Sequence, residues 1–80
     1  MASLQQPEVS ELIREIRSRT GLTQEQLAGK IGVVFTTLSK WERGKANPLP
    51  LALKRIEEVL QSMGDRGKDL LEQYFPNRIE

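Results

Sequence analysis

The sequence predicts an all-α fold, a compact bundle of five helices, and three observations carry that prediction. Apolar residues recur at spacings of three and four along most of the chain, which is the period of a helix with one buried face. No segment alternates apolar and polar residues at every second position, the pattern of a half-buried strand. Glycines and prolines divide the chain into segments of helical length. These breaks are Gly21, Gly32, Gly44, Pro48, Pro50, Gly64, Gly67 and Pro76.

The first helix is expected at about residues 7–20, with Gly21 just beyond its end. Its inward-facing residues are Val9, Leu12, Ile13 and Ile16. The second helix begins at Thr23, where the run Thr-Gln-Glu-Gln matches a capping box. In that motif the Thr23 hydroxyl accepts from the amide three residues on, and the Gln26 side chain reaches back. Gly32 ends this helix, whose core face is Leu27, Ala28 and Ile31.

The third helix is expected to run from Val34 or Phe35 to Arg43. The fourth starts near Pro48 or Pro50, because proline suits the first turn of a helix, and ends at Gly64. Its inward side consists of Leu53, Ile56, Leu60 and Met63. A fifth helix is expected at about residues 66–75, and it carries Leu70, Leu71, Tyr74 and Phe75. This last apolar surface either completes the core or, in part, forms a dimer contact.

The length and composition limit the function. Eighty residues fit one domain, and we expect an extension at 1–6, a domain at 7–75 and a tail at 76–80. Cysteine and histidine are absent, which removes the commonest metal ligands and general base. With no glycine-rich phosphate loop and no serine elbow either, we expect no enzyme, metal, cofactor or small-molecule ligand. No apolar run nears the roughly 18 residues that span a bilayer, so we expect a cytoplasmic protein without membrane contact.

Charge is unevenly distributed, although the net charge is only +1. Between Lys30 and Arg55 there are six basic residues and one acidic residue, whereas both flanking segments are net negative. A basic middle between acidic ends indicates a face for a polyanion, unless the cluster is a chance group of solvated charges.

The segment 35–43 separates apolar from polar side chains on a helical wheel. Leu38 and Trp41 fall together on one side, so we expect Trp41 in the core. The other side carries Thr36, Ser39, Lys40 and Arg43, with Phe35 at its flank. Hydroxyls and lysine can bond to base edges and arginine can reach phosphates, although a merely solvated polar face would share this composition.

The neighbouring residues have the layout of a helix-turn-helix unit at about residues 23–43. Ala28, in the first helix of the unit, is small enough to let the two helices cross closely. Gly32 lies in the turn, where the backbone is expected to reach positive φ. Such a unit sets its second helix in the major groove of DNA.

The stretch LTQEQLAGKIG…TTLSKWERGKANP resembles the helix-turn-helix of the Xre type, also called the Cro and phage-repressor family. The resemblance covers roughly residues 13–60. It rests on Leu22-Thr23-Gln24, Leu27-Ala28, Gly32, Leu38, Trp41-Glu42-Arg43-Gly44 and Pro48. It implies a repressor-like DNA-binding domain in an intracellular transcriptional regulator of bacterial or phage type. Such a regulator binds double-stranded operator DNA, usually as a homodimer on a palindromic site.

The resemblance also implies roles for individual residues. Positions that face base edges are Phe35, Thr36 and Lys40, with Ser39 beside them. Positions that contact the sugar-phosphate backbone are Thr23, Gln24, Arg43, Lys45 and Asn47. Arg17 and Glu42 match a pair that forms a partly buried ion pair and fixes the recognition helix.

Two positions depart from the family pattern. Val34 stands where Ser or Thr is common, so the recognition helix lacks a side-chain cap, at a cost of about 1 kcal/mol. Phe35 stands where a polar base-reader is common, and it can contact a thymine methyl, cover the core or mark a surface for a protein partner. A second function therefore stays open, a helix-turn-helix module or antitoxin whose main partner is another protein. A third hypothesis is a DNA-binding module of a longer regulator.

Overall fold

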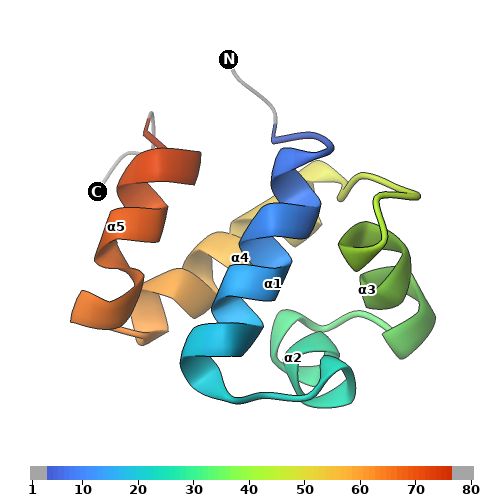
Figure 1. Ribbon diagram of the computed structural model, residues 1–80, viewed down its shortest axis with the longest axis horizontal. Coiled ribbons are helices and arrows are strands. Elements are labelled where there is room, and N and C mark those ends of the chain that lie inside the picture. Colours follow the sequence, from blue (N-terminus) through green and yellow to red (C-terminus); the bar gives the residue numbers. More distant parts are fainter. Residues whose placement is uncertain (1–3, 77–80) are drawn as a thin grey trace.

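The computed structural model describes residues 4–76, and this part of the chain consists of five helices and connecting loops, without a strand (Figure 1). The predicted all-α fold is confirmed. The helices are α1 (Glu8–Thr20), α2 (Gln24–Ile31), α3 (Phe35–Glu42), α4 (Pro50–Ser62) and α5 (Asp65–Tyr74). None of them is both long and apolar enough to cross a membrane.

The ends of the first two helices follow from local sequence. Helix α1 starts at Glu8, one residue later than expected, and Pro7 directly precedes its first turn. The capping box at α2 is present: the Gln26 amide donates to Thr23 Oγ1 at 3.1 Å, and the Thr23 amide donates to Gln26 Oε1 at 2.9 Å. Gly32 follows α2 with φ of 89°, a conformation that only glycine adopts without strain. This left-handed residue turns the chain from α2 into α3.

The last three helices begin without a side-chain cap. At α3 the reason is Val34, as the sequence predicted. Pro50 occupies the first turn of α4, whereas Pro48 is buried in the preceding loop. Helix α5 starts and ends one residue earlier than expected, and the two residues Met63 and Gly64 form the turn between α4 and α5.

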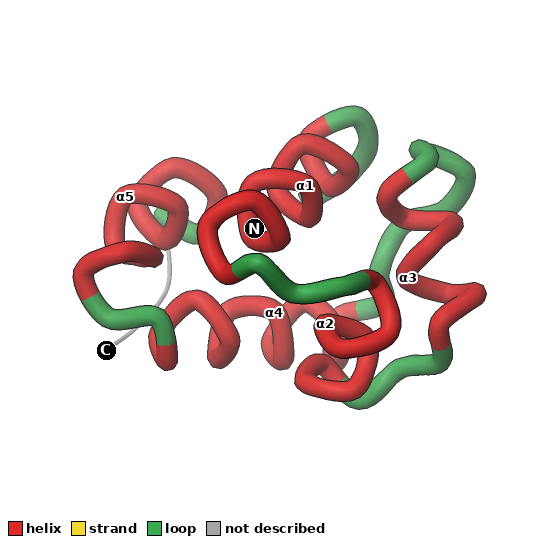
Figure 2. Tube along the Cα trace, turned by 60° about the horizontal axis from the view of Figure 1, so that its bottom comes forward, coloured by secondary structure: helices red, strands yellow, loops and turns green. Residues whose placement is uncertain are grey.

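The core lies where α1 packs against α3 and α5, where α2 packs against α3 and α4, and where α4 packs against α5 (Figures 1 and 2). The buried apolar residues include every expected one of α1, α2 and α3, and Trp41 is only 3% exposed. In α4 and α5 the buried residues include Ile56, Leu60, Leu70 and Leu71. Leu53 and Met63, which were expected to face inward, are only half-buried against the edge of the core, and so are Tyr74 and Phe75, for which the sequence left a core role and a dimer contact open.

Two contacts lie outside the sequence prediction. Leu4, in the segment expected to precede the domain, belongs to the core and is 8% exposed. Gly67 lies in the first turn of α5, directly against the backbone of Leu60 in α4. A Cβ atom at Gly67 would collide with the Leu60 carbonyl, so this close approach of α4 and α5 depends on glycine. Residues 77–80 of the expected tail, and 1–3 of the extension, lie outside the described residues.

Candidate nucleic-acid interface

Helix α3 presents a polar face to solvent. Its side chains at Leu38 and Trp41 are buried, which fixes the rotation of the helix about its axis. Thr36 and Lys40 are exposed, Ser39 is half-buried, and Phe35 is 45% exposed. The four residues assigned to base reading therefore follow the outer side of one helix, and none is enclosed by the rest of the domain.

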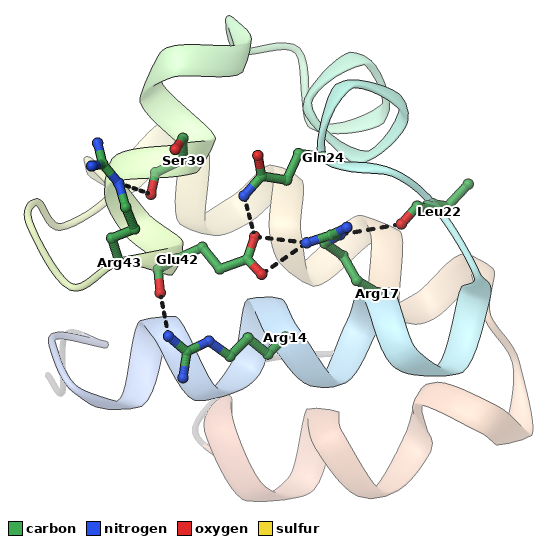
Figure 3. A network of polar contacts seen from close by, with 7 residues as sticks. All are labelled: Arg14, Arg17, Leu22, Gln24, Ser39, Glu42 and Arg43. Carbon is green, nitrogen blue, oxygen red and sulfur yellow. Dashed lines mark hydrogen bonds and ion pairs between the residues drawn. The ribbon is translucent and has the colours of Figure 1, made fainter.

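A polar network ties the C-terminal end of α3 to α1 and α2 (Figure 3). Arg17 Nη1 donates to both carboxylate oxygens of Glu42, at 2.8 and 3.1 Å, and Arg17 Nε donates to the Leu22 carbonyl at 3.2 Å. Gln24 Nε2 donates to Glu42 Oε1 at 2.8 Å. The Glu42 side chain is only 12% exposed. The structure thus contains the ion pair that the resemblance implied. This pair holds the C-terminal end of α3 against α1.

Gln24 has two possible roles in this geometry. The resemblance assigns it to a phosphate, whereas the structure brings its side-chain nitrogen to Glu42. An amide nitrogen has two N–H donors, and the contact with Glu42 uses one of them. Gln24 is half-buried at the first position of α2, so the second donor stays close to the surface. Thr23, which caps the same helix, is exposed.

The loop after α3 carries three further predicted contact residues: Arg43, Lys45 and Asn47, all exposed. Its backbone returns to α3 through three hydrogen bonds, from Arg43 N to the Ser39 carbonyl at 3.0 Å, from Gly44 N to the Trp41 carbonyl at 3.1 Å and from Lys45 N to the Lys40 carbonyl at 2.8 Å. These bonds satisfy carbonyls that have no partner within the helix. The loop is therefore a continuation of the C-terminal end of α3.

The cations of α3 and of the loop that follows it can bind an anion, because their charges are not used in ion pairs among residues 4–76. Within residues 4–76, the ion pairs join Arg17 to Glu42 and Arg19 to Glu15 and Asp69, so none involves the cations of α3 and its loop. Those cations are Lys40, Arg43 and Lys45. Arg43 Nε makes only a long contact of 3.4 Å with the Ser39 carbonyl. These three cations, which have no ion-pair partner among residues 4–76, lie beside the hydroxyls of Thr36 and Ser39 and form a surface suited to a polyanion.

Sequence reasoning missed two residues that support this surface. Arg14 Nη2 donates to the Glu42 carbonyl at 3.1 Å, at the last turn of α3. Gln6 reaches the same region from the segment before α1. Both contact backbone carbonyls, which have no signature in a side-chain pattern.

A protein-family model described as helix-turn-helix matches residues 13–63, more than half of the chain. The chain therefore belongs to the helix-turn-helix family, and the resemblance to its Xre and Cro type is confirmed. No solved structure gave a significant match.

Several curated relatives carry names of this family. The HTH-type transcriptional activator BcrR of Enterococcus faecalis is 43% identical over an alignment of 67 residues, and the alignment covers 80% of this chain but only 33% of BcrR. An uncharacterized HTH-type transcriptional regulator of Archaeoglobus fulgidus is 54% identical over 58 residues, 72% of this chain and 79% of the relative. A putative multi-protein-binding factor 1 of Yarrowia lipolytica is 39% identical over 62 residues, 78% of this chain and 40% of that protein. The chain thus spans about a third of BcrR.

Proposed function

We propose that this protein is a transcriptional regulator that binds double-stranded DNA sequence-specifically, with α3 in the major groove. One observation carries the proposal: α3 exposes Thr36 and Lys40 while Trp41 and the Arg17–Glu42 pair fix it from the inner side. A rigid helix with small hydroxyls near its start can approach base edges closely. The names of the bacterial and archaeal relatives support the same function.

Contacts to DNA divide between two groups of side chains. Bases are read by Phe35, Thr36, Ser39 and Lys40. Phosphates are held by Thr23, Gln24, Arg43, Lys45 and Asn47. The exposure of the loop cations and the spare N–H donor of Gln24 support the second group. In this division the phosphate contacts set the register of the domain, and the face of α3 reads the sequence.

Two copies bind as a homodimer on a palindromic operator. Their recognition helices enter successive major grooves about one helical turn apart. Regulation follows from occupying a promoter. The domain that does this comprises the expected residues 7–75 together with Leu4 and Gln6, which pack onto it.

Two alanine variants test the assignment of roles. Lys40→Ala should weaken binding to the preferred duplex more than to random duplex, because it removes a base contact. Arg43→Ala should weaken binding to both duplexes to a similar degree, because it removes a phosphate contact. It should also lower by about one the salt slope, which is the steepness with which log K falls as log salt concentration rises. Binding isotherms at several salt concentrations measure both effects. Equal losses for the two variants on every duplex would contradict the assignment.

A protein partner is the second candidate, and the apolar surface favours it. The large apolar side chains that residues 4–76 expose lie at the starts of α3 and α4: Val34, Phe35, Leu49 and Leu51. A hollow of about 210 Å³ beside the turn between α2 and α3 is lined by Ile31, Val33, Leu49, Leu51 and Ala52, among others. The name of the Yarrowia relative agrees with protein binding. Affinity that falls steeply with salt indicates duplex binding, whereas an apolar contact is much less sensitive.

A further inference from the structure

Gln6 connects the segment before α1 to the loop at residues 43–47. Its side-chain nitrogen Nε2 donates to the carbonyl oxygens of Trp41 and Ala46, both at 2.8 Å. Its backbone N–H donates to Asn47 Oδ1, also at 2.8 Å. One residue therefore holds the chain on both sides of the loop.

The orientation of the Gln6 side chain is fixed from the other end. The Ser10 amide donates to Gln6 Oε1 at 3.1 Å, and the Ser10 hydroxyl donates to the Pro7 carbonyl at 2.9 Å. Because an N–H group meets the amide oxygen, the NH₂ group must face the two loop carbonyls. Leu4, two residues earlier, is buried in the core and anchors the segment.

Among residues 43–47 only Ala46 packs against the core, so the cationic part of the loop has few other restraints. Arg43, Lys45 and Asn47 are exposed, and such backbone opens easily when its hydrogen bonds are few. The backbone bonds from Arg43, Gly44 and Lys45 reach only into the last turns of α3. Among the described residues, Gln6 supplies the hydrogen bonds that join the far end of the loop, at Ala46 and Asn47, to the body of the domain.

We propose that Gln6 is a positioning residue of the nucleic-acid interface. By holding both ends of the loop, it presents Arg43, Lys45 and Asn47 to the phosphates without contacting DNA itself. The part of the inference that concerns phosphates rests on the proposed function. The restraint of the loop by Gln6 does not, because it is present in the free protein. Gln6 lies outside the residues 13–63 that the family model matches, so the interface depends on chain beyond the family unit.

Amide hydrogen exchange in the free protein tests the restraint directly. Gln6→Ala should speed exchange at Gly44 and Lys45 by about tenfold, the factor for losing one or two hydrogen bonds. Gln6→Glu, which keeps the size of the side chain but removes its NH₂ donors, should do the same. Gln5→Ala is the matched control, because Gln5 is exposed and its side chain makes no hydrogen bond within residues 4–76. Unchanged exchange in both Gln6 variants would overturn the positioning role.

Duplex binding by the same variants tests the consequence. Gln6→Ala should weaken binding roughly tenfold and reduce the salt slope by about one to two, with unchanged base preference. Val59→Ala is the control for a general loss of stability, because it removes two buried methyl groups from α4. As long as this variant is folded, its salt slope for duplex binding should equal that of the wild type. Faster loop exchange with an unchanged salt slope would refute the link to phosphates. A wild-type chain that binds no duplex would refute the proposed function and this link together, whatever the exchange shows.

Discussion

Removal of the Glu42 carboxylate should be among the most damaging single changes in the domain. Glu42→Ala takes away the ion-pair partner of Arg17 and the acceptor for Gln24, so Arg17 keeps only its hydrogen bond to the Leu22 carbonyl. Stranding one member of a fully buried ion pair costs about 3–5 kcal/mol. Water reaches part of this pair, since the Arg17 side chain is 30% exposed, and we therefore expect a loss of about 2–3 kcal/mol.

Thermal and urea denaturation followed by circular dichroism measure this loss. For a domain of this size, about 2–3 kcal/mol lowers the Tm by roughly 10–20 °C. Glu58→Ala is the control, because Glu58 is exposed on α4 and forms no ion pair within residues 4–76; its effect should stay within about 0.5 kcal/mol. A double-mutant cycle with Arg17→Ala should give a coupling energy of about 1.5 kcal/mol. If Glu42→Ala destabilised the domain no more than Glu58→Ala, or if the coupling energy with Arg17→Ala were near zero, the role of the pair in fixing α3 would be refuted.

Further predictions concern glycines and acid stability. Gly67→Ala should destabilise the domain by about 1–3 kcal/mol in urea denaturation, because its Cβ would collide with the backbone of α4. Gly29→Ala, with open space around the new Cβ, should instead stabilise α2 by up to about 1 kcal/mol; equal effects would exclude the close approach. The hydrogen bond from Arg19 lowers the pKa of Asp69, so this pair stabilises the fold above the ordinary carboxyl pKa and is lost as pH falls through the lowered value. Asp69→Asn should therefore reduce the decrease in the free energy of unfolding that accompanies a fall in pH at the acidic end of the range. An unchanged decrease would contradict this role of the pair.

The sequence was sufficient for the helices and for the inner side of the site. Regular apolar spacing located all five helices to within about two residues, because each buries one stripe against the same core. The capping box before α2 and the turn at Gly32 are local, and local chemistry determines them. Trp41 was placed in the core by its phase with Leu38 alone.

The support of the loop could not be predicted, and the reason is physical. Gln6 meets backbone carbonyls that lie 35 and 40 residues away, and a carbonyl acceptor is the same at every residue. A lone glutamine before a helix is indistinguishable from any exposed polar residue. Gly67 was equally ambiguous, since a glycine that permits close helix packing has the same sequence pattern as one that ends a helix. Both roles depend on how separate elements of the fold pack against each other, which the sequence pattern does not show.

Selection from a pool of random duplexes at two salt concentrations tests the central claim most directly. We predict enrichment of an inverted repeat whose half-sites lie about 10 base pairs apart. Its affinity should exceed that of random duplex by about 10³ or more, and should fall steeply as salt rises. A purified chain that enriches no sequence, and binds no duplex even at low salt, would contradict the account.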